Sequence, residues 1–436
     1  MSTPTSASRR KVAILGGNRT PFARSNREYA NASNQDMLTA AINGLVARTG
    51  LQDVELGMVA AGAVIKHSRD FNLTRESVLG SALAPTTPAI DVQQACGTGL
   101  AAAVLVADGI AAGRYDAAIA GGTDTISDAP LMVSDPLRRT LIKLSHARSV
   151  SQRLKLVGSI RPNQLVPESP ANSEPRTGLS MGEHAAITAR EFGITREDQD
   201  ALALASHQKL AAAYDAGFFN DLITPFLGVT KDTNLRPDST MESLAKLKPV
   251  FGKQDAIDHG AQATMTAGNS TTLTDGASVA LLGTEEFAAT HGLTPWAYLV
   301  DSETAAVDYV HGPDGLLMAP TYAVPRLLAR NGLTLQDFDF YEIHEAFASQ
   351  VLATLQAWES EDYCRDRLGL KGALGPIDAS KLNVKGSSLA AGHPFAATGA
   401  RVLATAAKTL HENGGGRALI SICAAGGQGI TAILEA

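Results

Sequence analysis

The chain has 436 residues, a formal net charge of −7 and a hydrophobic content of 44%. This length is too great for one ordinary core, so we expect two or three domains. The negative charge argues against general nucleic-acid binding, but it leaves room for a local basic site for a phosphorylated ligand. No apolar run approaches the roughly 20 residues that span a bilayer, and residues 1–10 lack the apolar core of a signal peptide.

The first part of the chain alternates strand-like and helix-like segments. The predicted elements are a strand over 11–16 ended by Gly16-Gly17, a helix over 33–48 capped by Ser33 or Asn34, a strand end at 91–94, a helix over 99–112, and a strand over 116–120 leading into Gly121-Gly122. The helix over 99–112 is apolar on all sides, so we expect it to be buried.

The stretch from 137 to 161 carries basic but no acidic residues, and its leucines recur at roughly helical spacing. Several prolines follow, from Pro162 to Pro175, and mark an extended connection. The stretch is typical of an insertion carried on the scaffold, with a solvated basic face as the plain alternative to a binding role. An acidic amphipathic helix is predicted next, over 195–216, with Thr195 as its N-cap.

A similar order recurs in the last hundred residues. The predicted elements are a strand over 381–384, a helix over 396–410 opened by Pro394 and ended by the glycines at 414–416, and a strand over 418–423 leading into Gly426-Gly427. The recurrence predicts two related α/β halves whose reactive loops face each other. The alternative is that any α/β protein repeats strand–helix units.

Four segments rich in small residues hold the side chains suited to chemistry, at 92–99, 343–348, 391–395 and 422–429. Cys96 precedes a predicted helix by a short glycine turn, so the positive end of that helix is expected to lower the pKa of its thiol. His393, held at a helix start before Pro394, is a natural base for the thiol proton. A lone Cys or Gly-His-Pro is usually structural, but the joint pattern favours a nucleophilic site.

Cys423 requires a second role, because one thiol can be the nucleophile while the other moves a proton at carbon. Carbon acids next to a thioester are weak, so such a site also needs oxyanion donors. The backbone after Cys423 and the side chains of His344 and His393 could supply those donors.

Cysteine is scarce, and the three cysteines, Cys96, Cys364 and Cys423, have no paired spacing. This argues against a disulfide framework and for a reducing compartment, so we expect a cytoplasmic protein. No His/Cys pair has the spacing of metal ligands, and the glycine clusters do not match phosphate-binding motifs. Neither a metal nor a bound cofactor is therefore expected.

The four segments, together and in this order, resemble those of the thiolases, and the resemblance covers nearly the whole chain. It implies that Cys96 carries the acyl group, that His393 activates it and helps to form an oxyanion hole, and that Cys423 is the general acid/base at the acetyl methyl carbon. It places His344 where the family has an Asn or His that holds a water for the thioester oxyanion. A second oxyanion hole would use the backbone N–H groups of Cys96 and Ala425.

The resemblance also implies a fold. We expect an α/β protein with two duplicated halves in a layered α-β-α-β-α core and an added loop domain. The N-terminal half would comprise residues 1–129 with 250–285, the loop domain 130–249, and the C-terminal half 286–436. Coenzyme A would bind as a substrate against the loop domain.

Three matches to the family's CoA contacts are weaker. Thr271 stands in a segment, 267–276, that resembles the pantetheine contact. Arg236 matches an arginine near the CoA nucleotide, and Met181 matches a lid residue beside the thioester. The alternatives are that Thr271 caps a turn, that Arg236 is a solvated charge and that Met181 belongs to the core.

The sequence departs from the family pattern in two places. Ala425 replaces the first glycine of the usual Cys-x-Gly-Gly-Gly ending, which keeps a backbone N–H but loses the freedom of glycine to adopt positive φ. The basic insertion at 137–178 is longer than in compact thiolases and, with His344 in place of Asn, resembles the branch that serves long-chain fatty-acid oxidation. The insertion could contact a partner subunit, a membrane surface or the CoA phosphates.

The expected activity is cleavage of a 3-oxoacyl-CoA by CoA to acetyl-CoA and a shortened acyl-CoA, as in fatty-acid β-oxidation. Acetoacetyl-CoA synthesis and cleavage of a branched or sterol side chain are the alternatives within the fold. A structural or lipid-carrying subunit would have lost a catalytic residue, and a Cys–His hydrolase would not need Cys423. We expect a homodimer or homotetramer, with a hydratase/dehydrogenase subunit as a further partner.

Overall fold

The computed structural model describes residues 10–436, so the signal-peptide expectation falls mainly on residues outside the described part. The strands are β1 (Ala13–Arg19), β2 (Ala23–Arg24), β3 (Met58–Ala61), β4 (Ala89–Asp91), β5 (Ala117–Asp124), β6 (Thr274–Gly283), β7 (Ala297–Ala306), β8 (Phe340–Ile343), β9 (Arg417–Ala424) and β10 (Gln428–Glu435).

The α-helices are α1 (Asn34–Thr49), α2 (Leu73–Leu79), α3 (Thr98–Ala111), α4 (Asp135–His146), α5 (Val150–Val157), α6 (Met181–Glu191), α7 (Arg196–Asp215), α8 (Met241–Ala245), α9 (Lys253–Asp258), α10 (Glu285–Thr290), α11 (Ala319–Asn331), α12 (Ala348–Glu359), α13 (Glu361–Asp366), α14 (Ser388–Ala391) and α15 (Ala397–Asn413). The short 3₁₀ helices are η1 (Ser68–Asp70), η2 (Pro162–Leu165) and η3 (Ala379–Lys381).

One mixed sheet runs through the molecule in the order β4-β3-β5-β6-β1-β7-β10-β9-β8, with β2 paired to β6. Within the first half β3 is parallel to β4 and β5, whereas β6 is antiparallel to β5 and β1. In the second half β8 is parallel to β9, and β10 is antiparallel to β9 and β7. Within the sheet, the two halves are joined by the pairing of β1 with β7 at Ala13–Tyr298 and Ile14–Ala297.

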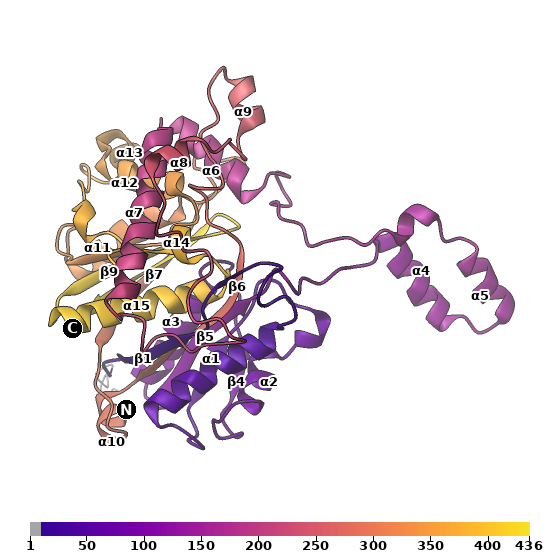
Figure 1. Cartoon of the computed structure of the whole chain (residues 1–436), viewed down its shortest axis with the longest axis horizontal. Coiled ribbons are helices and arrows are strands. Elements are labelled where there is room, and N and C mark those ends of the chain that lie inside the picture. The colour runs from indigo at the N-terminus through magenta and orange to yellow at the C-terminus, as the bar shows by residue number, and fades with distance from the viewer. Residues whose placement is uncertain (1–9) are drawn as a thin grey trace, which may run out of the picture.

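Helices cover both faces of each half of the sheet (Figure 1). Helices α3 and α15 pack against each other in the centre, and their apolar side chains share one core with strands of both halves. Helices α1 and α2 cover the outer face of the first half, and α11 and α12 cover that of the second. The expected α/β class is confirmed. The division into three domains stays a prediction.

Two glycine pairs that were expected to end strands lie inside them instead. Gly16-Gly17 belongs to β1 and Gly121-Gly122 to β5, so this expectation was wrong. The reason is the close approach of α15 and the turn before it. An added Cβ at Gly17 would lie 2.4 Å from the Cβ of Ala404, and one at Gly122 would lie 2.2 Å from the carbonyl oxygen of Ala396. Helix packing therefore requires the glycines within the ladder.

The strand expected at 381–384 is absent, and η3 with a loop takes its place. Asn383 adopts a φ of 46°, and its side-chain amide accepts from the N–H of Ile343 and donates to the carbonyl of the same residue, both at 2.9 Å. The amide side chain thus occupies the place of a neighbouring strand beside the end of β8. A pattern of apolar residues does not reveal this substitution of side chain for backbone.

The predicted helix caps are confirmed. The Ser33 hydroxyl, rather than Asn34, accepts from the Asp36 N–H at the start of α1. The Thr195 hydroxyl likewise accepts from the Asp198 N–H at the start of α7. Both caps satisfy backbone donors that have no partner within the helix.

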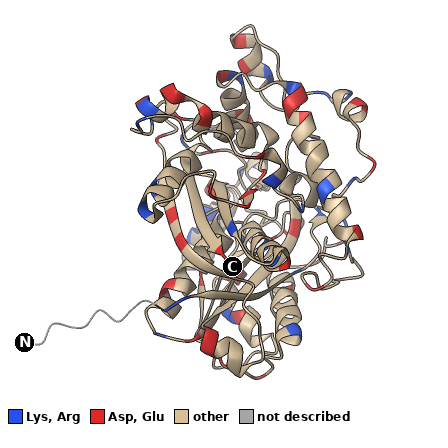
Figure 2. Ribbon diagram, turned by 90° about the vertical axis from the view of Figure 1, so that its left-hand side faces the viewer, with Lys and Arg blue, Asp and Glu red and all other residues tan. Residues whose placement is uncertain are grey.

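The basic insertion forms a helical hairpin of α4 and α5 that stands away from the body, at the right of Figure 1. Apolar side chains along it are exposed, including Leu141, Ile142, Val150 and Leu154. On the body, acidic and basic residues are interspersed, mostly on the outer helices and loops (Figure 2). Over residues 10–436, none of the helices combines the length and the apolar character needed to cross a membrane.

Candidate active site

Cys96 lies in the turn between β4 and α3, and His393 lies in the turn between α14 and α15. The turn before α3 is tight, since Ala95 has a φ of 46°, which a non-glycine residue rarely adopts. The Thr98 hydroxyl stabilises it by accepting from the Gln94 N–H at 2.8 Å and donating to the Ala95 carbonyl at 2.7 Å. The Cys96 Sγ lies 3.1 Å from the Nε2 of His393, so the expected nucleophile and base are in contact.

His393 is held by its second ring nitrogen, because Nδ1 lies 2.6 Å from the Thr398 hydroxyl. Its backbone N–H donates to the carbonyl of Thr272 at 3.2 Å. Gly392 before it has a φ of 98°, and an added Cβ there would lie 2.5 Å from the Thr274 side chain. Only glycine therefore permits this turn to bring His393 up to Cys96.

The expected lowering of the Cys96 pKa is wrong. Desolvation raises the pKa of this thiol to about 12, although the backbone N–H groups of Ala425 and of Cys96 itself act in the opposite direction. Burial also lowers the pKa of His393 to about 3, with a further contribution from the positive charge of Arg401. Desolvation is the largest contribution to both shifts, and it disfavours the charged form of each group. At rest the pair is therefore a neutral thiol and a neutral imidazole.

Cys423 lies near the end of β9 and is buried in an apolar cluster with Met181, Met265 and Phe347. Burial raises the pKa of the Cys423 thiol, and the nearby Cys96 raises it further. Each thiol thus disfavours ionisation of the other, which is the behaviour of two groups that share one site. A thiol that keeps its proton at neutral pH can donate it to carbon.

The loop after Cys423 accommodates the unusual alanine. Gly426 and Gly427 have φ values of 78° and 71°, whereas Ala425 is not among the residues of positive φ. The backbone conformation at Ala425 is thus one that any residue can adopt. The backbone N–H of Ala425 interacts with the Cys96 sulfur, so it lies where the sequence placed one oxyanion donor.

His344 follows β8 and lies beside the other histidine, with ring centroids 4.3 Å apart. Its Nδ1 is 3.0 Å from the Ser388 hydroxyl, whereas its Nε2 is buried without a hydrogen-bond partner. Burial, then His393 and Arg401, hold the pKa of His344 well below its usual range. One ring nitrogen of each histidine and the Cys96 sulfur all lie within 4.8 Å of one another. The three could hold a metal ion despite their sequence spacing, so the expectation of no metal stays untested.

The three candidate CoA residues lie in different surroundings. Met181 begins α6 and packs, half-buried, against the Cys423 cluster. The Thr271 hydroxyl donates to the carbonyl of Ser388 at 2.8 Å, so it ties the segment to α14. Arg236 is exposed; burial, followed by the positive charges of Arg236 and Arg24, lowers the pKa of His207 to about 4.

Several supporting residues were missed by the sequence analysis. Asp124 accepts from the backbone N–H groups of Val64 and Ile65 and from that of Ala396. These hydrogen bonds join the two halves three residues after His393. Glu345 accepts from the hydroxyl of Ser206 and the amide of Asn383. Both carboxylates are fully buried, and the pKa of Asp124 is raised to about 7 by burial. The available indication was an acidic residue inside an otherwise largely apolar segment.

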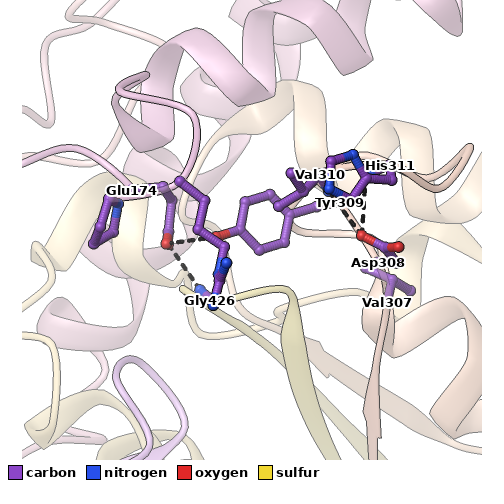
Figure 3. A pocket seen from close by; sticks show the side chains of 9 residues that line it. Glu174, Val307, Asp308, Tyr309, Val310, His311 and Gly426 are labelled. Atoms are coloured by element: carbon purple, nitrogen blue, oxygen red, sulfur yellow. Dashed lines mark hydrogen bonds between the residues drawn. The ribbon is translucent and has the colours of Figure 1, made fainter.

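A surface cavity of about 630 Å³ lies beside the loop that follows Cys423. Glu174 reaches into it from the loop before α6 and accepts from the Gly426 N–H at 2.8 Å and from the Tyr309 hydroxyl at 2.9 Å (Figure 3). The carboxylate thus holds the glycine loop from outside. Glu174 was not predicted from the sequence.

Two family profiles match the chain, the "Thiolase, N-terminal domain" over residues 12–286 and the "Thiolase, C-terminal domain" over residues 293–436. The chain belongs to the thiolase family. This thiolase is 42% identical over 431 residues to a 3-ketoacyl-CoA thiolase of Yersinia pestis (strain Pestoides F), with 98% of this chain and 97% of the relative covered. A Yersinia pseudotuberculosis protein of the same name, from serotype O:1b (strain IP 31758), matches equally.

Solved structures of the same family have the same fold as this thiolase. Human mitochondrial 3-ketoacyl-CoA thiolase in complex with CoA is 28% identical, with a TM-score of 0.79 and 98% of each chain covered. The Bacillus anthracis acetyl-CoA acetyltransferase is also 28% identical, with a TM-score of 0.80, and the match covers 99% of this chain and 100% of that one. The sequence-based assignment to the family is confirmed.

Proposed function

We propose that this thiolase, an acyltransferase by family, cleaves a 3-oxoacyl-CoA with CoA to acetyl-CoA and a shortened acyl-CoA, as in fatty-acid β-oxidation. The observation that carries the proposal is the contact of the Cys96 sulfur with His393 beside a second neutral thiol, Cys423. A Cys–His hydrolase would need only the pair of Cys96 and His393, without Cys423. The named 3-ketoacyl-CoA thiolases, 42% identical over almost the full chain, support this substrate class.

In the first half-reaction, His393 takes the proton of Cys96 as the sulfur attacks the keto carbon of the substrate. The backbone N–H groups of Cys96 and Ala425 stabilise the resulting alkoxide. When the alkoxide collapses, the carbon–carbon bond breaks and its electron pair passes to the thioester enolate. Cys423 protonates that enolate at carbon, acetyl-CoA leaves, and the acyl group remains on Cys96.

In the second half-reaction, the Cys423 thiolate takes the proton of an incoming CoA thiol. The CoA sulfur attacks the acyl carbon, and the Cys96 sulfur departs and recovers its proton from His393. Both thiols end as they began, with their protons. The raised pKa of Cys423 suits this cycle, because the group must hold its proton until a strongly basic carbon is formed.

The test is a mass measurement of the intact protein mixed with a 3-oxoacyl-CoA in the absence of free CoA. We expect an acyl adduct on the peptide that contains Cys96, and its discharge when CoA is added. Cys96→Ala should show neither adduct nor cleavage. Near-normal cleavage by Cys96→Ala would overturn the proposal.

A second candidate function is acetoacetyl-CoA synthesis, and the likeness to the B. anthracis acetyl-CoA acetyltransferase favours it. Both functions use the same four side chains, so these residues do not distinguish them. The two functions are separated by kcat/KM over a series of acyl-chain lengths. Cleavage of a branched or sterol side chain would show in the same series. CoA acts as a substrate in every case, and no bound cofactor is proposed.

We also propose that this thiolase is a cytoplasmic homodimer or homotetramer. We further propose that a hydratase/dehydrogenase subunit binds the hairpin of α4 and α5. The hairpin supports the partner proposal because it projects from the body and exposes apolar side chains such as Val150 and Leu154 (Figure 1). The mass of the native complex, with the full chain and with the hairpin deleted, tests the oligomeric state and the partner, and fractionation of cells that express the chain tests the location. A hairpin-deleted chain that keeps the mass of the full complex would contradict the partner proposal.

A further inference from the structure

A buried chain of polar groups leads from the centre of α15 to His344. Arg401 on α15 is only 4% exposed, and its guanidinium donates to the Ser388 hydroxyl at 2.7 Å and to the Ser387 hydroxyl at 3.2 Å. The Ser388 hydroxyl in turn lies 3.0 Å from the Nδ1 of His344. All of these groups are removed from solvent, so each hydrogen bond has a strong effect on its neighbour.

The direction of these hydrogen bonds follows from the donor inventory. A guanidinium has donors and no acceptor, so Arg401 donates to the Ser388 oxygen. The hydroxyl hydrogen of Ser388 is then free to point at the Nδ1 of His344, which accepts it. In a neutral imidazole one nitrogen accepts and the other carries the proton, so with Nδ1 as the acceptor the proton of His344 would lie on Nε2.

The Nε2 atom of His344 is buried and has no hydrogen-bond partner among the described residues. It belongs to a ring that lies 4.3 Å from the ring of His393, beside the Cys96 sulfur. A buried N–H without a partner is costly unless a ligand or water uses it. Burial, with a smaller contribution from the positive charge of Arg401, opposes protonation of both histidines and keeps His344 in its neutral form.

We infer that Ser388, held by Arg401, fixes His344 as the Nε2–H tautomer and so makes it a hydrogen-bond donor toward the thioester oxygen of the substrate. Ser388 and Arg401 are positioning residues, since they act through His344 and touch no reacting atom. The donor acts on the oxygen that becomes negative when the acetyl-CoA enolate forms, either directly or through a water that it orients. This inference rests on the proposed thiolase reaction and names two residues that set the geometry of its oxyanion site.

The tautomer can be read directly by nitrogen NMR of the full chain labelled at histidine, in the resting state without substrate. The difference spectrum against His344→Asn identifies the His344 signals. We expect a protonated Nε2 and an unprotonated Nδ1 in the unaltered chain. A protonated Nδ1 would overturn the inference.

The variants then test the role of the Ser388 hydroxyl. Ser388→Ala should populate the other tautomer and lower kcat/KM about 10- to 100-fold, because one oxyanion donor is turned away. Ser388→Thr keeps a hydroxyl and should restore both the tautomer and most of the activity. Ser387→Ala is the matched control, since it removes a hydroxyl from the same guanidinium without touching His344, and it should keep the tautomer.

If Ser388→Ala keeps a single Nε2–H tautomer, or keeps kcat/KM within about twofold, the inference fails. The thermal midpoint of each variant shows whether it is folded before its tautomer is read. The inference and the proposed function can fail separately. An unaltered chain that does not cleave 3-oxoacyl-CoA refutes the function, whereas active protein with a protonated Nδ1 refutes only the inference.

Discussion

The Nε2 of His393 lies 3.1 Å from the Sγ of Cys96, although the two residues are 297 positions apart in the chain. Desolvation raises the pKa of the thiol to about 12 and lowers that of the imidazole to about 3. The resting pair is thus uncharged, and the thiolate forms as the substrate is attacked.

The reactivity of Cys96 should rise continuously with pH. Because its pKa is far above neutrality, the thiolate fraction should grow about tenfold per pH unit through the neutral and mildly alkaline range. The rate of alkylation by iodoacetamide, followed by mass spectrometry of the peptide, measures this. A rate that is already level at neutral pH would instead indicate a preformed thiolate–imidazolium pair. His393→Gln should leave the rise in place, because desolvation rather than His393 is its main cause.

Asp124 should make folding stability fall as pH rises from about 4 to about 7. Burial raises its pKa from 3.8 to about 7, so the folded state binds the proton more tightly than the unfolded state. The stabilisation is complete below the pKa of Asp124 in the unfolded state and is lost as pH rises through its pKa in the folded state. Its contribution to the free energy of unfolding has an upper limit of roughly 4 kcal/mol. The thermal midpoint of Asp124→Asn relative to the unaltered chain should increase over this range. A constant difference between the two midpoints would contradict the assignment.

Loss of the Glu174 carboxylate should slow turnover without greatly changing KM. The carboxylate fixes the Gly426 N–H next to Ala425, whose backbone N–H is the proposed oxyanion donor, so Glu174→Ala should lower kcat by about tenfold. Tyr309→Phe is the control, because it removes the other hydrogen bond of Glu174 and leaves the loop contact intact. Steady-state kinetics with a 3-oxoacyl-CoA measure both. Equal losses in the two variants would assign the effect to the cavity rather than to the loop.

The buried ion pair of Arg19 with Asp232 should be essential for stability. The guanidinium reaches both carboxylate oxygens, at 2.5 and 2.7 Å, and the Tyr214 hydroxyl adds a third contact at 2.8 Å. Arg19→Met alone should cost about 3–5 kcal/mol, because it leaves a buried carboxylate without its cation. Unfolding in urea measures the loss. The double variant Arg19→Met, Asp232→Asn should cost less than the sum of the single changes, and a strictly additive result would argue against the pairing.

Ala425→Gly should be tolerated, with activity within about twofold of the unaltered chain, since Ala425 needs no positive φ. Gly427→Ala is the matched opposite change. Gly427 has a φ of 71°, and an added Cβ would lie 2.6 Å from the carbonyl oxygen of Val307. This variant should lose most of its activity and stability. Thermal midpoints and kcat decide the matter, and an active, stable Gly427→Ala would show that the loop is not held as described.

The sequence predicted elements well where a local feature decides the structure. Ser33 and Thr195 were recognised as caps because a hydroxyl at a helix start satisfies a nearby N–H whatever the rest of the fold does. The glycines of β1 and β5 were wrongly predicted to end their strands, because glycine in a sequence indicates a turn until the helix that packs on the strand is known. The prediction of a strand at 381–384 failed for the same reason, since the Asn383 amide takes the place of that strand through a contact with Ile343.

By itself the sequence determined which chemical groups this thiolase has and in which kind of turn each one stands, because Cys96, His393 and Cys423 each lie within three residues of a glycine. Only the tertiary structure decided the charge state of those groups. Asp124 and Ala396 are 272 positions apart, and Arg401 acts on His344 through Ser388 from another helix. Desolvation and hydrogen-bond direction depend on every neighbour in space, so the neutral thiols and the tautomer of His344 follow from packing.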